Sequence, residues 1–130
     1  MSTVPRRLTQ SPLRSLSRDR RARLPVSFTI EVRPARDRVI VVPAGELDLV
    51  TCAVLSSEVR TLLDDGFAHV VVDLRELTFL GSSGIHTLLA CSHHADRLGA
   101  RFSLIYGTYA IRLPLKICGL HDHFDVEPSR

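Results

Sequence analysis

Residues 70–85 read VVVDLRELTFLGSSGI, and this stretch decides the fold. The β-branched run that starts at His69 and ends at Asp73 predicts a strand buried on both faces, as in the middle of a parallel sheet. A short connection then leads to Ser82 and Ser83, which stand between two glycines at the start of a predicted helix. Backbone N–H groups and the helix dipole favour negative charge at such a position. The stretch therefore predicts an exposed hydroxyl at a site suited to phosphorylation.

On the N-terminal side of this stretch, two strands and a helix are predicted. Apolar residues alternate over 26–32, a turn signal follows at 34–37, and residues 39–42 are expected to return as the antiparallel partner strand. An apolar stripe then predicts a helix that has Thr51 as its N-cap and ends at Gly66. The chain thus opens with a β-hairpin followed by a helix.

On the C-terminal side, a helix is predicted from about Ser83 to Leu98, then a strand over 101–106 and a third helical segment up to Cys118. Pro114 either lies in the first turn of that segment or kinks it, because a proline in a helix interior loses a hydrogen bond. The element order is β-β-α-β-α-β-α. This order predicts an α/β fold with a small, mostly parallel sheet of four to five strands, opened by a β-hairpin, with the helices packed mainly on one face.

The charge of the chain is divided unevenly. Residues 1–25 carry seven arginines and one aspartate, whereas the rest carries ten basic and thirteen acidic residues, so the net charge of +3 comes from the N-terminal segment. Residues 1–25 lack a periodic apolar pattern and are predicted to form a disordered basic tail ahead of one folded domain, residues 26–130. The tail is either an inert extension or an arm that touches nucleic acid or anionic lipid. The mildly acidic domain argues against specific nucleic-acid binding, and the absence of a long apolar run argues against membrane insertion.

The sequence lacks the motifs of common enzyme and metal sites. Its three cysteines form no CxxC pair and are interpreted as small buried residues in a reducing cytosol. His86 and His93 are too far apart on the predicted helix to share an ion, and His94 points elsewhere, so no metal site is predicted. The serines do not form a Gly-x-Ser-x-Gly nucleophile elbow, and no P-loop is present. The sequence therefore predicts a cytoplasmic protein that is not an enzyme and uses no cofactor.

Five pieces of the chain occur in the order and at the spacing of a known family. They are Gly45-Glu46-Leu47-Asp48, Asp73-Leu74, Phe79-Leu80-Gly81-Ser82-Ser83-Gly84-Ile85, Ala95-Asp96-Arg97-Leu98-Gly99-Ala100 and Cys118-Gly119-Leu120. On these pieces, the chain from about Val26 to Val126 resembles the STAS domain and, within it, the bacterial anti-sigma factor antagonists. The resemblance implies the STAS-type fold and a role in regulating transcription rather than in catalysis.

The resemblance also implies a partner and a switch. Proteins of this kind bind an anti-sigma factor, often a serine kinase with a histidine-kinase-like ATPase fold, and thereby free the sigma factor. Phosphorylation of the first serine in the family motif breaks the complex, and a serine phosphatase restores it. Carried over to this chain, the phosphorylated residue is Ser82, with Ser83 as the alternative. An oligomer is compatible with the same resemblance.

The implied partner-binding surface combines the loop after the second strand with the head of the second helix. Its members are Glu46, Asp48, Gly81, Ser82, Ser83, Gly84 and His86. For Asp48, capping of the first helix is an equal alternative. Gly81 departs from the family, which usually has aspartate there, and the departure removes a negative charge beside the hydroxyl. It favours an alternative function, in which the chain is a STAS subunit docked constitutively in a larger sensory or membrane-transport assembly.

Overall fold

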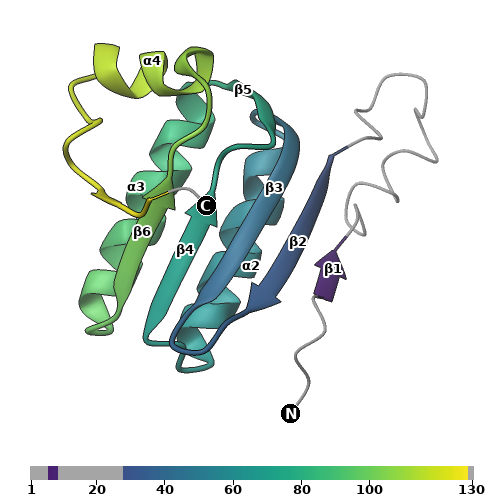
Figure 1. Cartoon of the computed structure of the whole chain (residues 1–130), viewed down its shortest axis with the longest axis vertical. Coiled ribbons are helices and arrows are strands. Elements are labelled where there is room, and N and C mark those ends of the chain that lie inside the picture. The colour runs from purple at the N-terminus through teal and green to yellow at the C-terminus, as the bar shows by residue number, and fades with distance from the viewer. Residues whose placement is uncertain (1–5, 9–27, 129–130) are drawn as a thin grey trace.

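A seven-stranded sheet forms the centre of the protein (Figure 1). The computed structural model describes residues 6–8 and 28–128. The elements in chain order are β1 (Arg6–Leu8), β2 (Thr29–Pro34), β3 (Val39–Leu47), α2 (Thr51–Asp64), β4 (His69–Asp73), β5 (Leu77–Leu80), α3 (Ser82–Arg97), β6 (Arg101–Ile105), α4 (Tyr109–Ile117) and β7 (Asp125–Val126).

The strands follow the order β1-β2-β3-β4-β6-β7, and β5 pairs separately with β3. β2 and β3 form the predicted antiparallel hairpin, with Thr29 opposite Ala44. The pairs β3–β4, β3–β5, β4–β6 and β6–β7 are all parallel. The predicted α/β fold with a mostly parallel sheet opened by a hairpin is therefore confirmed. The sheet has more strands than the four to five predicted, because β1, β5 and β7 are short and have weak sequence signals.

β5 is the main departure from the predicted element order, since its four residues belong to the predicted connection between strand and helix. Leu77 and Leu80 are buried while the two residues between them are exposed, so the alternation typical of a strand is absent. The strand forms because β3 continues past its predicted end at residue 42 to Leu47 and offers its edge as a partner. This pairing brings the two segments of the expected site together.

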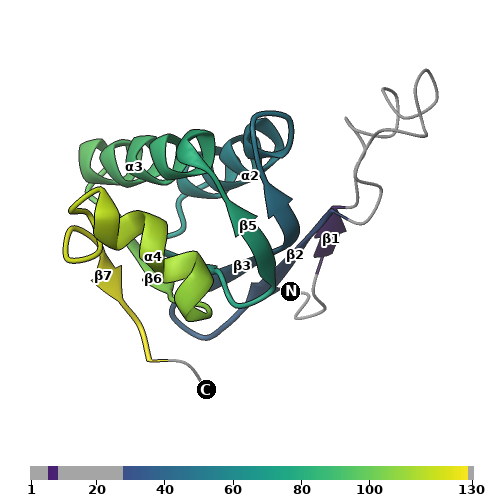
Figure 2. The same cartoon turned by 90° about the horizontal axis from the view of Figure 1, so that it is seen from above.

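α2 and α3 pack side by side on one face of the sheet, as predicted (Figures 1 and 2). α4 instead lies across the end of the sheet at which the parallel strands finish. The core between the helices and the sheet consists mainly of Leu55, Val59 and Leu62 from α2, Ile85, Leu88, Cys91 and Ala95 from α3, and Val39, Val41, Val70, Val72 and Leu104 from the strands.

The three cysteines differ in their surroundings. Burial raises the pKa of the Cys91 thiol to about 11, so this side chain stays protonated and behaves as a small apolar residue. Cys52 is half-buried, and Cys118 is exposed near the end of α4. The interpretation of all three cysteines as buried residues is therefore wrong for Cys118, which follows the short helix α4 rather than lying within the core.

α4 contains Pro114 in its interior rather than in its first turn, with Thr108 as the N-cap. Pro114 has no N–H to donate to the carbonyl of Ala110, so this helix is held by packing of Ile111 and Leu115 as well as by its ladder. Among residues 6–8 and 28–128, every helix is too short or too polar to cross a membrane.

The described part of the chain includes little of the predicted basic tail. Residues 6–8 form β1, which runs antiparallel to β2 and places Arg7 opposite Glu31. A strand here uses the free backbone edge of β2, and the local sequence of the tail does not reveal such a partner. The prediction of disorder for the other residues of the 1–25 segment lies outside the described residues.

Candidate functional site

Backbone pairing brings the loop after β3 beside the head of α3. Glu46 pairs with Phe79 and Leu47 with Leu80 in the β3–β5 ladder. The N–H of Gly81 then donates to the carbonyl of Leu47 at 3.3 Å. The two segments expected to form a surface are therefore neighbours, and β5 is the element that joins them.

Ser82 is the first helical residue of α3, directly after the N-cap Gly81. Its side chain is exposed, and no hydrogen bond engages its hydroxyl in the part of the chain that the structure describes. The first turn has no acidic side chain, and its leading N–H groups have no partner within the helix. Ser83 follows as a half-buried residue. Neither serine is the N-cap, and the Ser82 side chain is accessible to solvent.

Asp48 caps α2 from the loop after β3. Its Oδ1 accepts hydrogen bonds from the backbone N–H groups of Val50 and Thr51, each at 3.0 Å, and from the Thr51 hydroxyl at 3.1 Å. The same hydroxyl donates to the carbonyl of Glu46 at 2.6 Å. Of the two predicted roles for Asp48, the geometry shows capping. Thr51 is the first helical residue rather than the predicted N-cap, and its buried side chain ties the loop together.

Gly84 and Gly81 each let a neighbouring side chain approach the backbone closely, Gly84 in the core and Gly81 nearer the surface. A Cβ on buried Gly84 would lie 2.7 Å from Leu80 Cδ1 and 3.0 Å from Leu47 Cδ2, so a side chain there would push α3 off the sheet. Gly84 thus positions the surface from beneath. At Gly81, whose φ of −98° suits any residue, a Cβ would lie 2.9 Å from the Phe79 ring. The aromatic ring occupies the space beside Gly81.

Two of the predicted residues add polar groups to the surface. His86 is exposed and follows Ser82 by four residues, so both lie on the same face of α3. Glu46 is exposed on β3, opposite Phe79.

Three exposed apolar side chains on the segments that adjoin the head of α3 are missing from the predicted site. We call Leu49, Val50 and Phe79 the apolar rim; they are 76%, 39% and 49% exposed. Leu49 and Val50 lie between Asp48 and the start of α2, the helix that Asp48 caps. Phe79 lies on β5, and its ring is next to Gly81. Leu49 and Val50 directly precede the predicted start of a helix. Their position in a loop before a helix is the one local sign that they could be exposed. Phe79 could be identified only with β5 in place.

An ion pair between buried Asp73 and exposed Arg75 fixes the turn that leads into β5. Asp73 is 3% exposed at the end of β4, and Arg75 donates to it from Nη2 at 2.7 Å and from Nε at 3.0 Å. The backbone N–H of Arg75 also donates to Asp73 Oδ1. The hydrogen bonds and charge of Asp73 raise the pKa of Arg75, so the guanidinium stays charged. This turn sets the path of the chain toward Ser82.

The histidines of α3 do not gather at a metal site. His94 lies 2.8 Å from Asp64 on α2, and His93 contacts the ring of His123 edge-on at 6.4 Å. In residues 6–8 and 28–128, no group of three or more His, Cys, Asp or Glu side chains is arranged to hold an ion. The observed contacts of these histidines join neighbouring elements.

The comparisons with known proteins agree on one family. The STAS domain model matches residues 29–130. Anti-sigma-F factor antagonist RsfB of Mycobacterium tuberculosis is 29% identical over 100 residues, which cover 77% of this chain and 81% of that protein. An anti-sigma factor antagonist from Mycobacterium paratuberculosis has a solved structure that matches with a TM-score of 0.73 at 28% identity, over 82% of this chain and 90% of that chain.

A third relative shares the fold at lower identity. The anti-sigma factor antagonist SpoIIAA, solved in its unphosphorylated form, matches with a TM-score of 0.66 at 20% identity, over 80% of this chain and 89% of that chain. Because the family model covers most of the chain and the observed fold agrees with it, this protein belongs to the STAS domain family.

Proposed function

We propose that this protein is an anti-sigma factor antagonist, which binds an anti-sigma factor in the cytosol and so releases a sigma factor. The observation that carries the proposal is the exposed hydroxyl of Ser82 at the head of α3, beside two segments that carry exposed apolar side chains, the loop after β3 and β5. The chain's similarity to the anti-sigma-F factor antagonist RsfB and to a solved mycobacterial anti-sigma factor antagonist supports it. The protein acts by binding rather than by catalysis.

We further propose that phosphorylation of Ser82 switches the complex off. A phosphoserine adds about two negative charges and three acceptor oxygens. The free N–H groups and dipole of α3 accommodate that charge, so the protein's own fold stays intact. Pressed against a partner together with the apolar rim, the same charge loses its water and breaks the contact.

The partner in this proposal combines two functions. A serine kinase with a histidine-kinase-like ATPase fold would serve as both the bound anti-sigma factor and the enzyme that modifies Ser82. A serine phosphatase would then restore the active form. The contact surface is Glu46, Asp48, Ser82, Ser83 and His86 together with the apolar rim, while Gly81 and Gly84 shape it from within.

The geometry around Gly81 also favours a second candidate function, in which the protein is a permanently docked STAS subunit. The Phe79 ring fills the space where a family aspartate would project, so an exposed apolar group replaces the carboxylate beside Ser82. An apolar surface of this kind suits a stable interface, in which no phosphorylation is needed.

A Ser82→Asp variant tests the first function against the second. With an anti-sigma factor from the source organism, we expect roughly a thousandfold weaker binding, equal to about 4 kcal/mol, because the added charge is desolvated at the interface. Thermal unfolding should be nearly unchanged. Calorimetric titration measures the affinity, and mass spectrometry after incubation with partner and ATP identifies the modified serine.

Ser57→Asp is the matched control, because it adds the same charge at an exposed serine of α2. It should bind like the wild type. If Ser82→Asp also retains wild-type affinity, the proposed switch is wrong. Binding that persists with ATP while Ser82 remains unmodified would identify the constitutive subunit instead.

A further inference from the structure

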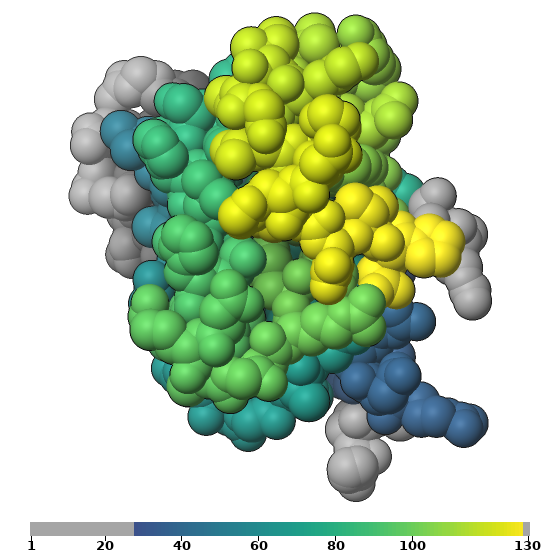
Figure 3. All heavy atoms as spheres, turned by 90° about the vertical axis from the view of Figure 1, so that its left-hand side faces the viewer, coloured from purple at the N-terminus to yellow at the C-terminus, as the bar shows by residue number. Residues whose placement is uncertain are grey.

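A hollow lies away from Ser82, between α4 and the chain that follows it. Its volume is about 240 Å³, and its walls are Tyr106, Tyr109, Arg112, Leu113, Lys116 and His121. Figure 3 shows α4 and the following chain, in yellow-green and yellow, packed against each other on this side of the protein. The predicted partner surface includes none of these residues.

Two cations on one face of α4 border this hollow. Arg112 and Lys116 are four residues apart in the helix and both are exposed, so their side chains extend from neighbouring turns. Within the described residues, neither forms an ion pair with a carboxylate. The Arg112 guanidinium lies 6.0 Å from the centre of the Tyr109 ring, a contact that orients it beside the hollow. Two positive charges are therefore held here without a negative partner.

His121 adds an independent sign of a missing partner. Among the described residues, its Nδ1 is the one buried side-chain nitrogen or oxygen that has no hydrogen-bond partner. Its Nε2 lies 3.4 Å from Asp122, and the His121 side chain as a whole is 41% exposed, so the buried nitrogen is on the inner edge of a partly exposed ring. Buried polar atoms are almost always satisfied in folded proteins, and exceptions require an explanation such as a bound molecule.

The base of the hollow is held by an internal hydrogen bond. The Tyr106 hydroxyl donates to the carbonyl of His121. Burial, aided by the charge of Asp122, raises the pKa of the Tyr106 phenol, so this donor stays protonated at neutral pH. The contact fixes His121 relative to β6 and keeps its ring against the hollow.

We propose that this hollow binds a small phosphate-bearing molecule. Arg112 and Lys116 supply charged donors for the phosphate oxygens, and His121 adds a ring nitrogen beside them; charge-assisted hydrogen bonds are roughly twice as strong as neutral ones. Tyr109 and Leu113 offer apolar contact to the carbon skeleton. Because the volume is below that of usual ligand pockets, the ligand is compact: a phosphomonoester with one small ring or a short chain.

Phenyl phosphate is a suitable probe, with phenol and inorganic phosphate as its separate parts. Titration of the full-length protein at constant ionic strength, followed by two-dimensional amide NMR, should give saturable shifts for residues 106–121. Phenyl phosphate should bind more tightly than inorganic phosphate, and phenol should not produce these shifts. The double variant Arg112→Gln/Lys116→Gln should weaken binding of phenyl phosphate by about tenfold or more.

The control is the double variant Arg36→Gln/Arg60→Gln, which removes two exposed arginines elsewhere and leaves the same net charge. It should retain the wild-type affinity. Equal weakening in the two double variants would show only general charge attraction and would overturn the proposal. Shifts that fail to saturate would also overturn it. Each outcome is independent of partner binding at Ser82, because no anti-sigma factor is present in the titration.

Discussion

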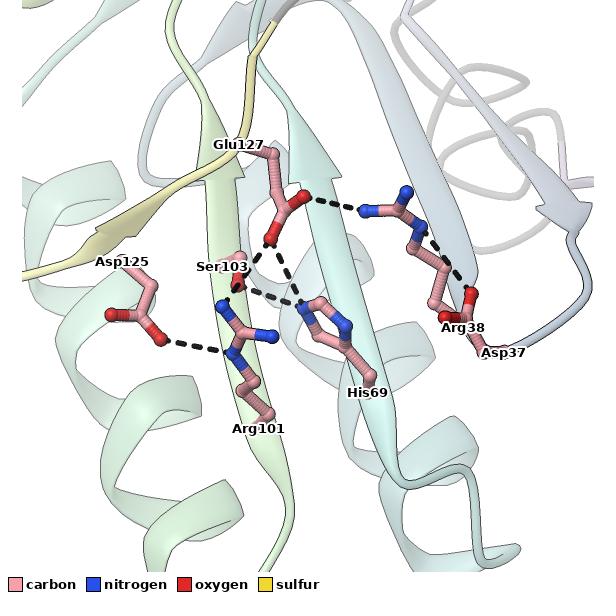
Figure 4. A network of polar contacts seen from close by, with 7 residues as sticks. All are labelled: Asp37, Arg38, His69, Arg101, Ser103, Asp125 and Glu127. Atoms are coloured by element: carbon pink, nitrogen blue, oxygen red, sulfur yellow. Dashed lines mark hydrogen bonds and ion pairs between the residues drawn. The ribbon is translucent and has the colours of Figure 1, made fainter.

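The surface around Ser82 and the sheet face near β7 differ in whether their polar groups have hydrogen-bond or ion-pair partners. At the head of α3, the Ser82 hydroxyl and the first backbone N–H groups have no hydrogen-bond partner among the described residues, and the apolar rim faces solvent. On the sheet face away from α2 and α3, polar side chains form a network in which each has a partner (Figure 4): Asp37, Arg38, His69, Arg101, Ser103, Asp125 and Glu127. The first region is the surface that we propose meets another molecule, and the second holds the end of the described chain against the sheet.

Glu127 is the centre of this network. Its Oε1 lies 2.5 Å from Arg38, and its Oε2 lies 3.6 Å from Arg101 and 3.7 Å from His69. Its backbone N–H donates to the carbonyl of Leu104 at 2.8 Å, which extends the β6–β7 pairing. The network thus fastens the end of the described chain to β3, β4 and β6.

Glu127→Ala should have the largest effect on folding of the changes that probe this contrast. Removing a carboxylate with 13% exposure leaves two arginines without their shared partner, and we expect a loss of about 2 kcal/mol in the free energy of unfolding. Urea unfolding measures it. Asp125→Ala, in an exposed pair with Arg101, is the control and should change stability little. Weakened partner binding in Glu127→Ala, at temperatures where it is folded, would break the separation of the two regions.

Phe79→Ala should produce the opposite result. Truncating an exposed aromatic anchor at the proposed interface is expected to weaken partner binding by about 2 kcal/mol, or roughly thirtyfold, with little change in stability. Phe67→Ala is the matched control, because Phe67 is 37% exposed in the loop before β4, at the other end of the sheet. If both variants bind equally well, the apolar rim has no role in recognition.

The smallest expected effect concerns the dependence of stability on pH. Burial and the charge of Arg101 lower the pKa of His69 below its ordinary value of 6.5, although Glu127 opposes them. The unfolded chain therefore takes up a proton on His69 before the folded protein does, and stability falls as the pH drops below about 6.5. His69→Gln, which keeps an uncharged polar group near Ser103, should show a shallower decline between about pH 7.5 and 5 in urea unfolding. Parallel curves for the two proteins would contradict this assignment.

The local pattern of apolar residues was sufficient to predict the helices and strands that bury a continuous apolar face. β4 and β6, α2 and α3 all lie close to their predicted positions, because periodic burial leaves a periodic sequence. The position of Ser82 at a helix start followed from the same reasoning. β5 could not be predicted, because two of its four residues face solvent and its pairing depends on how far β3 extends.

The details of the site depended on contacts between distant segments. Asp48 had two equal roles in the sequence, and only its bonds to Val50 and Thr51 identify it as a cap. The apolar rim joins Leu49 and Val50 to Phe79, across a gap of about thirty residues that the β3–β5 ladder closes. The hollow beside α4 likewise needs the chain after that helix to fold back, so that His121 lines it together with Arg112 and Lys116.

The sequence by itself determined the fold class, the family and the serine at the head of α3, because these depend on periodicity and on short motifs that act within one turn or strand. Only the tertiary structure decided which segments lie beside that serine. It also decided which carboxylate caps a helix, which carboxylates form ion pairs, and where two cations border a hollow. The physical reason is that exposure and hydrogen bonding are properties of neighbours in space. In a mostly parallel sheet, those neighbours come from strands separated by whole helices.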